Sequence, residues 1–312
     1  MALTLAESAK LSQNNLQRGV IETFVQESPI LDRLPLLPIE GNAYAYNEEA
    51  TLPGVEFRAV NSAYAESTGT VNQKTETLVI LGGDADVDTF IVKTRGNLNE
   101  QRALVTRGKV KAASYKYQDT FINGDTAVDA NSFDGLKKRL TGTQVISAAT
   151  NGLAVVGGDS AARQTFLDKL DELIALVAGG PDALYMNASV RSKLLSALRR
   201  ENQYTESVGV KREASYQGIP LVDIGSKADG TAIVPQTETQ GTSTAASSIY
   251  AVKYGRGESD QAVSGLTNGG ISVRDLGEQN SKPVFRTRIE FFCGLGVFGG
   301  KAAARLSGVL NS

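Results

Sequence analysis

Residues 43–93 are polar and strand-like, and they hold too little apolar sequence to bury themselves. Period-two alternation over 43–48, 75–78 and 84–89 predicts two strands in a long hairpin. At roughly 3.3 Å per residue, arms of about twenty residues reach about 60 Å, beyond the radius of an ordinary domain. Because a lone two-stranded ribbon is marginally stable in water, we expect the hairpin to lie on a neighbouring copy. The chain is therefore expected to be an assembly subunit rather than a monomeric enzyme.

Composition limits the classes of function that this chain can have. The 312 residues are 41% hydrophobic, enough for two modest cores or for one core with long extensions. A net charge of −2 gives no basic field for nucleic acid or an anionic membrane, so contact with nucleic acid is expected to be loose and non-specific. The chain has no histidine and one cysteine, which excludes a Ser-His-Asp triad, histidine-ligated zinc and an internal disulfide. We expect no catalytic, cofactor or metal site, and a buried, inert thiol at Cys293.

The N-terminus shows no basic-then-apolar signal, and no run of eighteen apolar residues occurs. We therefore expect folding in the cytoplasm where the chain is made, with no membrane partner.

The first half of the chain predicts two helices on either side of the hairpin. An amphipathic helix is expected over 3–27, with Thr4 and Glu7 as a capping box, and prolines then require an extended arm. A second helix is expected over 97–122, about 39 Å long at 1.5 Å per residue. Pro53-Gly54 and Gly82-Gly83 are interpreted as interruptions of the hairpin.

The second half predicts a compact α/β segment. Ser160 is expected to cap a helix with an apolar face, followed by a strand at 183–186, a helix that ends at Arg199-Arg200, and further strands at 218–224 and 248–252. Residues 236–247 are rich in Thr and Ser and predict an exposed loop. A strand over 283–293 and a short helix over 301–309 are expected to end the chain.

This order of elements resembles the major capsid protein of tailed bacteriophages, the Hong Kong 97-like fold. The residues that carry the resemblance are the elbow Ser28-Pro29-Ile30-Leu31, the strand entry at 82–88, the block at 181–186, the strand at 218–220 and the ending at 286–294. The resemblance implies an α+β chain with an N-terminal helix and arm (1–40), an extended hairpin loop (41–93), a P-domain with a spine helix (94–150), an A-domain (151–264), and a return to the P-domain with a C-terminal strand and helix (265–312).

The same resemblance implies partners and a location. It implies hexamers and pentamers that close an icosahedral shell around double-stranded DNA in a virion, assembled in the host bacterial cytoplasm. A portal, possible decoration proteins and a separate scaffolding protein are expected, the last because the chain opens directly with the arm helix. An encapsulin-like cellular nanocompartment shell is the alternative with the same fold. For a covalent link between subunits, Lys74 is the candidate donor, with Asn268 or Asn280 as acceptor.

Three other motif matches lack the surrounding residues that their usual function requires. Residues 294–299 match G-x-G-x-x-G, but the chain ends too soon for a dinucleotide fold, so the glycines are expected to form a strand-to-helix turn. Asp84, Asp86 and Asp88 begin like a calcium loop, yet Thr89 and Arg95 stand where glycine and glutamate are needed. Residues 137–139 (Lys-Lys-Arg) are too few for a nucleic-acid patch and predict a solvated face or a subunit contact.

Charge patterning supplies the candidate interface. Residues 41–92 hold eight acidic and two basic residues, a net charge of −6, whereas residues 93–140 hold ten basic and five acidic residues, a net charge of +5. If the hairpin lies on a neighbour's spine helix, these opposite charges steer docking and fix the register. The alternative is that both sets face water and contribute little. The candidate subunit-interface residues are Glu48, Glu49, Arg102 and Lys109.

Overall fold

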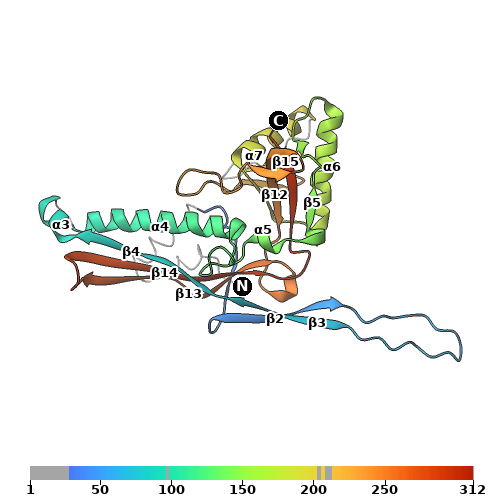
Figure 1. The fold of residues 1–312 in the computed structure, drawn as a ribbon, viewed down its shortest axis with the longest axis horizontal. Coiled ribbons are helices and arrows are strands. Elements are labelled where there is room, and N and C mark those ends of the chain that lie inside the picture. Colours follow the sequence, from blue (N-terminus) through green and yellow to red (C-terminus); the bar gives the residue numbers. More distant parts are fainter. Residues whose placement is uncertain (1–27, 96–97, 202–204, 208–212, 312) are drawn as a thin grey trace.

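The computed structural model of the chain describes residues 28–95, 98–201, 205–207 and 213–311 (Figure 1). The expected helix over 3–27 lies outside these residues. The first half of the described chain contains β1 (Leu36–Pro38), β2 (Ala43–Thr51), β3 (Thr70–Thr77), β4 (Val79–Asp88), α3 (Thr89–Arg95), α4 (Leu98–Asn123), α5 (Leu136–Arg139), η1 (Gly142–Gln144), β5 (Val145–Ser147) and β6 (Leu153–Ala154).

The second half begins with a helix and continues mainly as strands. Its elements are α6 (Ser160–Leu176), β7 (Ala183–Met186), α7 (Ala188–Arg200), β8 (Thr205–Ser207), β9 (Glu213–Tyr216), β10 (Ile219–Asp223), β11 (Glu238–Gln240), β12 (Ser243–Val252), η2 (Glu258–Asp260), β13 (Val263–Glu278), β14 (Val284–Val297) and β15 (Ala303–Leu310).

A long sheet in the order β1-β13-β14-β4 supports the helix α4, which runs along it (Figure 1). Tyr117 and Phe121 of α4 are fully buried, and the ring of Tyr117 lies 5.9 Å from that of Phe291 on β14. The buried side chains of this layer continue into the elbow, where Ile30 and Leu31 have no exposed surface. The expected spine helix is confirmed as α4, which ends one residue after the predicted position. We call the sheet β1-β13-β14-β4 the spine sheet.

The strand β4 corrects one expectation, because residues 84–89 were assigned to the hairpin. β4 instead pairs antiparallel with β14 over ten positions, from Val79 opposite Cys293 to Asp88 opposite Val284. The alternation of the sequence was real, since Ala85 and Val87 are buried between the acidic positions. Its partner lies about two hundred residues away along the chain, which local periodicity cannot reveal.

The hairpin itself consists of β2 and β3, paired from Ala43 opposite Thr77 to Thr51 opposite Thr70. Residues 52–69 continue beyond the paired part without a helix or strand. The ladder is thus shorter than the arms of about twenty residues that the alternation predicts. The hairpin and this loop project from one end of the molecule (Figure 1).

A second sheet, in the order β5-β15-β12-β7-β10-β9-β8, forms the central domain with the helices α6 and α7. β7 and α7 confirm their predictions, and all four residues of β7 are buried. The N-cap of α6 is Asp159 rather than Ser160, because an Asp159 carboxylate oxygen accepts a hydrogen bond of 2.8 Å from the backbone N–H of Ala162.

Two predictions in this domain are wrong. Residues 236–247 contain β11 and the start of β12, in which Ser247 and Ser248 are fully buried, since small side chains pack in a closely covered sheet. The expected helix over 301–309 is the strand β15, which pairs with β12 on one side and with β5 and β6 on the other. Pairing on both edges overrides the helix propensity of Ala302–Ala304. This segment therefore joins the central sheet and not the spine sheet.

Candidate subunit interface

The outer part of the hairpin exposes apolar side chains that no described part of the same chain covers. Phe57 and Val55 are essentially fully exposed, and they lie in the irregular segment 52–69 beyond the paired strands β2 and β3. Exposed apolar surface of this kind marks a contact with another molecule. The large apolar residues exposed on the hairpin are Leu52, Val55, Phe57, Val60, Tyr64 and Val71.

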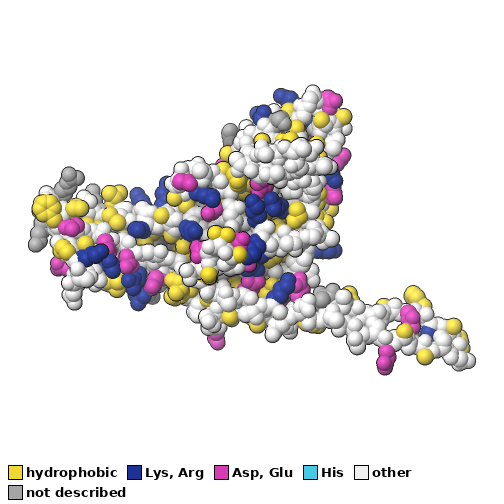
Figure 2. All heavy atoms as spheres, in the orientation of Figure 1, with side chains coloured by type: hydrophobic (Ala, Val, Ile, Leu, Met, Phe, Trp, Pro, Cys, Tyr) yellow, Lys and Arg dark blue, Asp and Glu magenta, His cyan; other side chains and the backbone are white. Residues whose placement is uncertain are grey.

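The opposite end of the molecule also exposes apolar side chains. Phe90 and Ile91 lie on α3, Leu104 near the start of α4 and Leu276 near the end of β13. The exposed Ile80 lies at the other end of β4, opposite Phe292. Hydrophobic atoms gather at the α3 end in the space-filling view, far from the hairpin (Figure 2). The molecule thus has apolar surface at both ends of its long axis.

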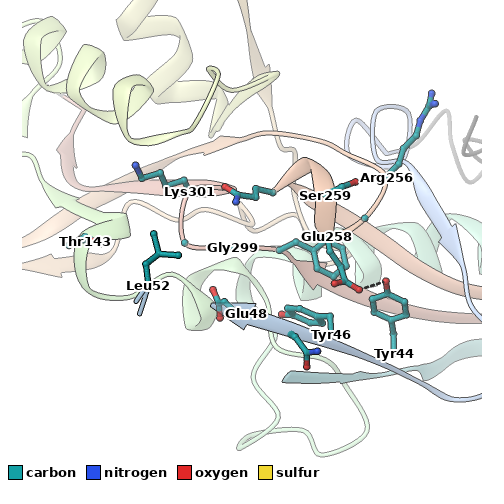
Figure 3. A pocket seen from close by; sticks show the side chains of 15 residues that line it. Tyr44, Tyr46, Glu48, Leu52, Thr143, Arg256, Glu258, Ser259, Gly299 and Lys301 are labelled. Carbon is teal, nitrogen blue, oxygen red and sulfur yellow. Dashed lines mark hydrogen bonds between the residues drawn. The ribbon is translucent and has the colours of Figure 1, made fainter. Parts of the chain in front are cut away.

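An aromatic cluster holds the root of the hairpin on the body. Tyr44 and Tyr46 stand on one face of β2, and both rings contact Phe298 edge to face, at centroid distances of 5.9 and 4.9 Å. The Tyr44 hydroxyl donates a hydrogen bond of 2.8 Å to the Glu258 carboxylate (Figure 3). Burial, followed by the hydrogen bond to Glu258, raises the pKa of Tyr44. Burial and the Glu76 carboxylate raise the pKa of Tyr46 to about 12, so both hydroxyls remain donors at neutral pH.

An open groove of about 1080 Å³ lies beside this cluster. Its lining carries both signs of charge, with Glu48 and Glu258 on one hand and Arg256 and Lys301 on the other (Figure 3). Leu52 lies at its edge and begins the exposed part of the hairpin. Among the described residues, no three His, Cys, Asp or Glu side chains gather closely enough to hold a metal ion. The groove thus combines aromatic side chains with charges of both signs.

Of the candidate interface residues, Glu48, Arg102 and Lys109 can be located, and Glu48 does not meet the two basic residues within one chain. Glu48 forms an ion pair with Lys74 on the opposite strand of the hairpin, and the side chain of Glu49 lies outside the described part. Arg102 turns toward its own spine sheet, where its guanidinium lies 2.5 Å from the Asp275 carboxylate. Lys109 is exposed beside the spine sheet. Whether they meet between copies stays a prediction.

Several charges that the pattern assigned to docking are paired inside the chain. The Asp84 carboxylate accepts hydrogen bonds of 2.8 and 3.0 Å from Arg288, and the Asp86 carboxylate accepts two bonds of 2.7 Å from Arg286. These bonds hold the pKa of both carboxyl groups below their usual value. They therefore contribute to the spine sheet and not to the charge of the hairpin. The sequence contained a signal for these pairs, because the two aspartates and the two arginines, 286 and 288, have the same i, i+2 spacing.

The glycine motif at 294–299 and the single cysteine both form part of the folded core and its turns. Gly294 and Gly296 lie within β14, and the strand β15 follows the turn at Gly299, so the expected strand-to-helix turn joins two strands instead. Cys293 is buried as expected, and burial raises the pKa of its thiol to about 12. In the part of the chain that the structure describes, no helix is long and apolar enough to span a bilayer.

Comparison with known proteins bears directly on this geometry. Residues 12–166 match the family model for the major capsid protein GP7, and no curated protein matches the chain. Among solved structures, the holo-SrpI encapsulin complex from Synechococcus elongatus PCC 7942 is similar at a TM-score of 0.63 and 18% identity, over 91% of this chain and 88% of that one. The chain has the Hong Kong 97-like capsid fold.

Two further solved structures support the same fold. The capsid of an empty GTA particle matches at a TM-score of 0.61 and 13% identity, over 91% of this chain and 90% of that one. The structure of Mycobacterium phage Adephagia matches at a TM-score of 0.57 and 13% identity, over 92% and 89% of the two chains. The family matched by residues 12–166 is that of a major capsid protein, which is a structural protein, and the solved structures show the fold that such proteins have.

Proposed function

We propose that this chain assembles into hexamers and pentamers that close an icosahedral shell around double-stranded DNA. The observation that carries the proposal is the apolar surface at the two ends of the long axis, on the hairpin and around α3. A contact between two different surfaces of identical subunits repeats around a ring when the rotation closes. Such a ring would cover the side chains that a single copy leaves in water.

The hairpin is the element that most needs a neighbour. Within residues 28–311, as far as the structure describes them, no layer covers its outer residues 52–71, and an isolated two-stranded ribbon is marginally stable in water. We propose that it lies on the spine helix of the next copy, with Glu48 and Glu49 near Arg102 and Lys109 of that copy. Because Arg102 is engaged by Asp275 of its own chain, Lys109 is the more available of the two cations.

The rest of the expected organisation follows from the same proposal. We propose that the spine sheet and α4 form the P-domain, and that the central sheet with α6 and α7 forms the A-domain. β15 is assigned to the A-domain because it pairs with β12. The proposed partners are a separate scaffolding protein, a portal, decoration proteins and packaged DNA held by non-specific contacts. The proposed place of assembly is the cytoplasm of the host bacterium, and the finished particle is the virion capsid.

Expression of the chain with and without its companion assembly proteins tests this function. Closed, roughly spherical particles in electron micrographs are the expected result, and uniform particles are expected only with a scaffolding protein. Uniform capsids of native size from this chain alone would contradict the need for a scaffold.

The alternative is an encapsulin-like shell, because an encapsulin is among the similar structures. The two functions differ in what the shell holds. Particles purified from the native source are expected to contain nuclease-protected double-stranded DNA. A packaged enzyme in place of DNA would favour the encapsulin-like function.

A further inference from the structure

Three consecutive basic residues on the single turn α5 reach three different parts of the molecule. They were expected to face water or a neighbouring subunit, but each has an acidic partner within the chain. Lys137 pairs with the central sheet, Lys138 with the segment that follows the spine helix, and Arg139 with the root of the hairpin.

The Arg139 contact is the most directional of the three. Its two terminal nitrogens lie 2.5 and 2.6 Å from the two carboxylate oxygens of Glu76, near the end of β3. The side chains are only 18% and 13% exposed. A two-pronged contact between guanidinium and carboxylate fixes orientation as well as distance. The Tyr46 hydroxyl, which donates to the Val297 carbonyl at 3.3 Å, lies beside the pair.

The Lys137 contact reaches the central sheet. Its ammonium group lies 2.9 Å from the Glu238 carboxylate on β11, whose side chain is 10% exposed. A guanidinium nitrogen of Arg305 on β15 lies 3.0 Å from the same carboxylate. Glu238 thus joins α5 to two strands of the central sheet.

The turn itself is fixed to the end of the spine helix. The backbone N–H of Gly135 donates to the carbonyl of Gly124 at 2.9 Å, and Leu136 is fully buried. Lys138 lies 2.6 Å from Asp125 and 2.9 Å from Asp134, both in the connection between α4 and α5. Lys138 therefore stays within the spine unit, whereas its two neighbours reach out of it.

We propose that α5 is an ionic junction that sets the position of the hairpin and of the central sheet relative to the spine helix. Arg139 is the positioning residue for the hairpin, and Lys137 is the positioning residue for the central sheet. If the proposed shell function holds, the junction determines the direction in which the hairpin reaches a neighbour. The junction is a property of the single subunit, so its test does not depend on assembly.

Distances between pairs of spin labels on the full-length, unassembled subunit test the junction. Gln73→Cys on β3 with Ala112→Cys on α4 reports the hairpin, and Asp168→Cys on α6 with Ala112→Cys reports the central sheet. All three sites are exposed, whereas native Cys293 is buried from the label. Arg139→Gln is expected to broaden and shift the hairpin distances and to leave the central-sheet distances unchanged. Lys137→Gln is expected to do the reverse, with a smaller change because the side chain of Lys137 is more exposed to solvent than that of Arg139.

Lys138→Gln is the matched control, since it removes the same charge from the same turn but is expected to move neither distance. Glu76→Gln removes the hairpin pair from the other side and serves if Arg139→Gln fails to fold. Exchanging the two charges, with Glu76→Arg and Arg139→Glu together, is expected to restore part of the narrow distribution. Hairpin distances in Arg139→Gln and Glu76→Gln equal to those in Lys138→Gln would overturn the proposal.

Discussion

Gly82 shows how the absence of one side chain lets two strands pair. A Cβ atom at Gly82 would lie 2.3 Å from the backbone carbonyl oxygen of Ile289 on β14, closer than any real contact allows. At Gly83 the nearest atom would be the side-chain Cδ of Lys109, 3.9 Å away. The pair Gly82-Gly83 is therefore part of a strand and does not interrupt a hairpin, and only the first glycine is sterically required.

Gly82→Ala is expected to destabilise the subunit by about 1–3 kcal/mol, because β4 must shift away from β14. Gly83→Ala has room for its methyl group and reduces the freedom of the unfolded chain, so a change between zero and about 1 kcal/mol of stabilisation is expected. Denaturant unfolding of the two variants measures the difference. Equal stability of both would show that β4 can move without cost.

The carboxylates of Asp84 and Asp86 predict a dependence of stability on acid. Because arginine hydrogen bonds lower their pKa in the folded state, the carboxylates contribute stability above the ordinary pKa of 3.8. That stability is lost as the pH falls through the lower pKa of the folded state. The double variant Asp84→Asn, Asp86→Asn is expected to be less stable at neutral pH and to lose less stability on acidification.

Unfolding free energies of wild type and variant, measured from neutral pH to about pH 3, test this. Other carboxyl groups with lowered pKa, such as that of Asp275, keep part of the slope in the variant. Parallel curves for the two proteins would contradict the assignment.

At the scale of elements, the sequence predicts what local patterns determine. The spine helix and the helix α7 are long and have end signals, and the structure confirms both. Residues 301–309 were predicted as a short helix, but pairing with the distant strands β12 and β5 makes this segment the strand β15. The residues of β4 were assigned to the hairpin because local alternation indicates a strand but does not show its partner, which is the remote strand β14.

The candidate site was predictable only in part. The polar, exposed hairpin follows from residues 43–77, but its anchoring does not. The contact of Tyr46 with Phe298 and the pair of Glu76 with Arg139 join positions that are far apart in the chain. The i, i+2 spacing of Tyr44 and Tyr46 could have shown that they share a face, although it could not identify the partner.

Charge reversal on the hairpin tests the proposed interface. Glu48→Lys with Glu49→Lys changes the net charge of residues 41–92 from −6 to −2, and assembly is expected to slow while the subunit stays folded. Steering through solvent decays over about 10 Å at 0.1 M salt, so the wild-type assembly rate should fall as salt rises, and that of the variant should fall less. Light scattering measures both rates.

The matched control for that experiment is Asp168→Lys with Glu172→Lys, an equal change of charge on the distant helix α6. Lys109→Glu in the hairpin variant is expected to restore part of the assembly rate if Lys109 is a true partner. Arg102→Glu is expected to restore less of the rate, because Arg102 already forms an ion pair with Asp275 of its own chain. Wild-type rates in the double reversal at low salt would show that the charges do not steer docking.

At the scale of the whole molecule, both ends of the long axis expose apolar surface, and each end is suited to cover the other end of a neighbouring copy. The hairpin end exposes Val55 and Phe57, and the α3 end exposes Phe90 and Leu104. The described part of one copy has no surface that covers either set, whereas a ring of copies brings the end of one molecule to the next. The covering of the hairpin by a neighbour is the central claim of this account.

Electron microscopy of the wild type beside Val55→Ser with Phe57→Ser, at equal concentration and with folding checked by circular dichroism, tests that claim most directly. Wild-type chains are expected to form closed, roughly spherical particles, and the folded variant is expected to remain largely as free subunits. A wild type that stays a stable monomer at high concentration, or a variant that assembles as well as the wild type, would contradict it.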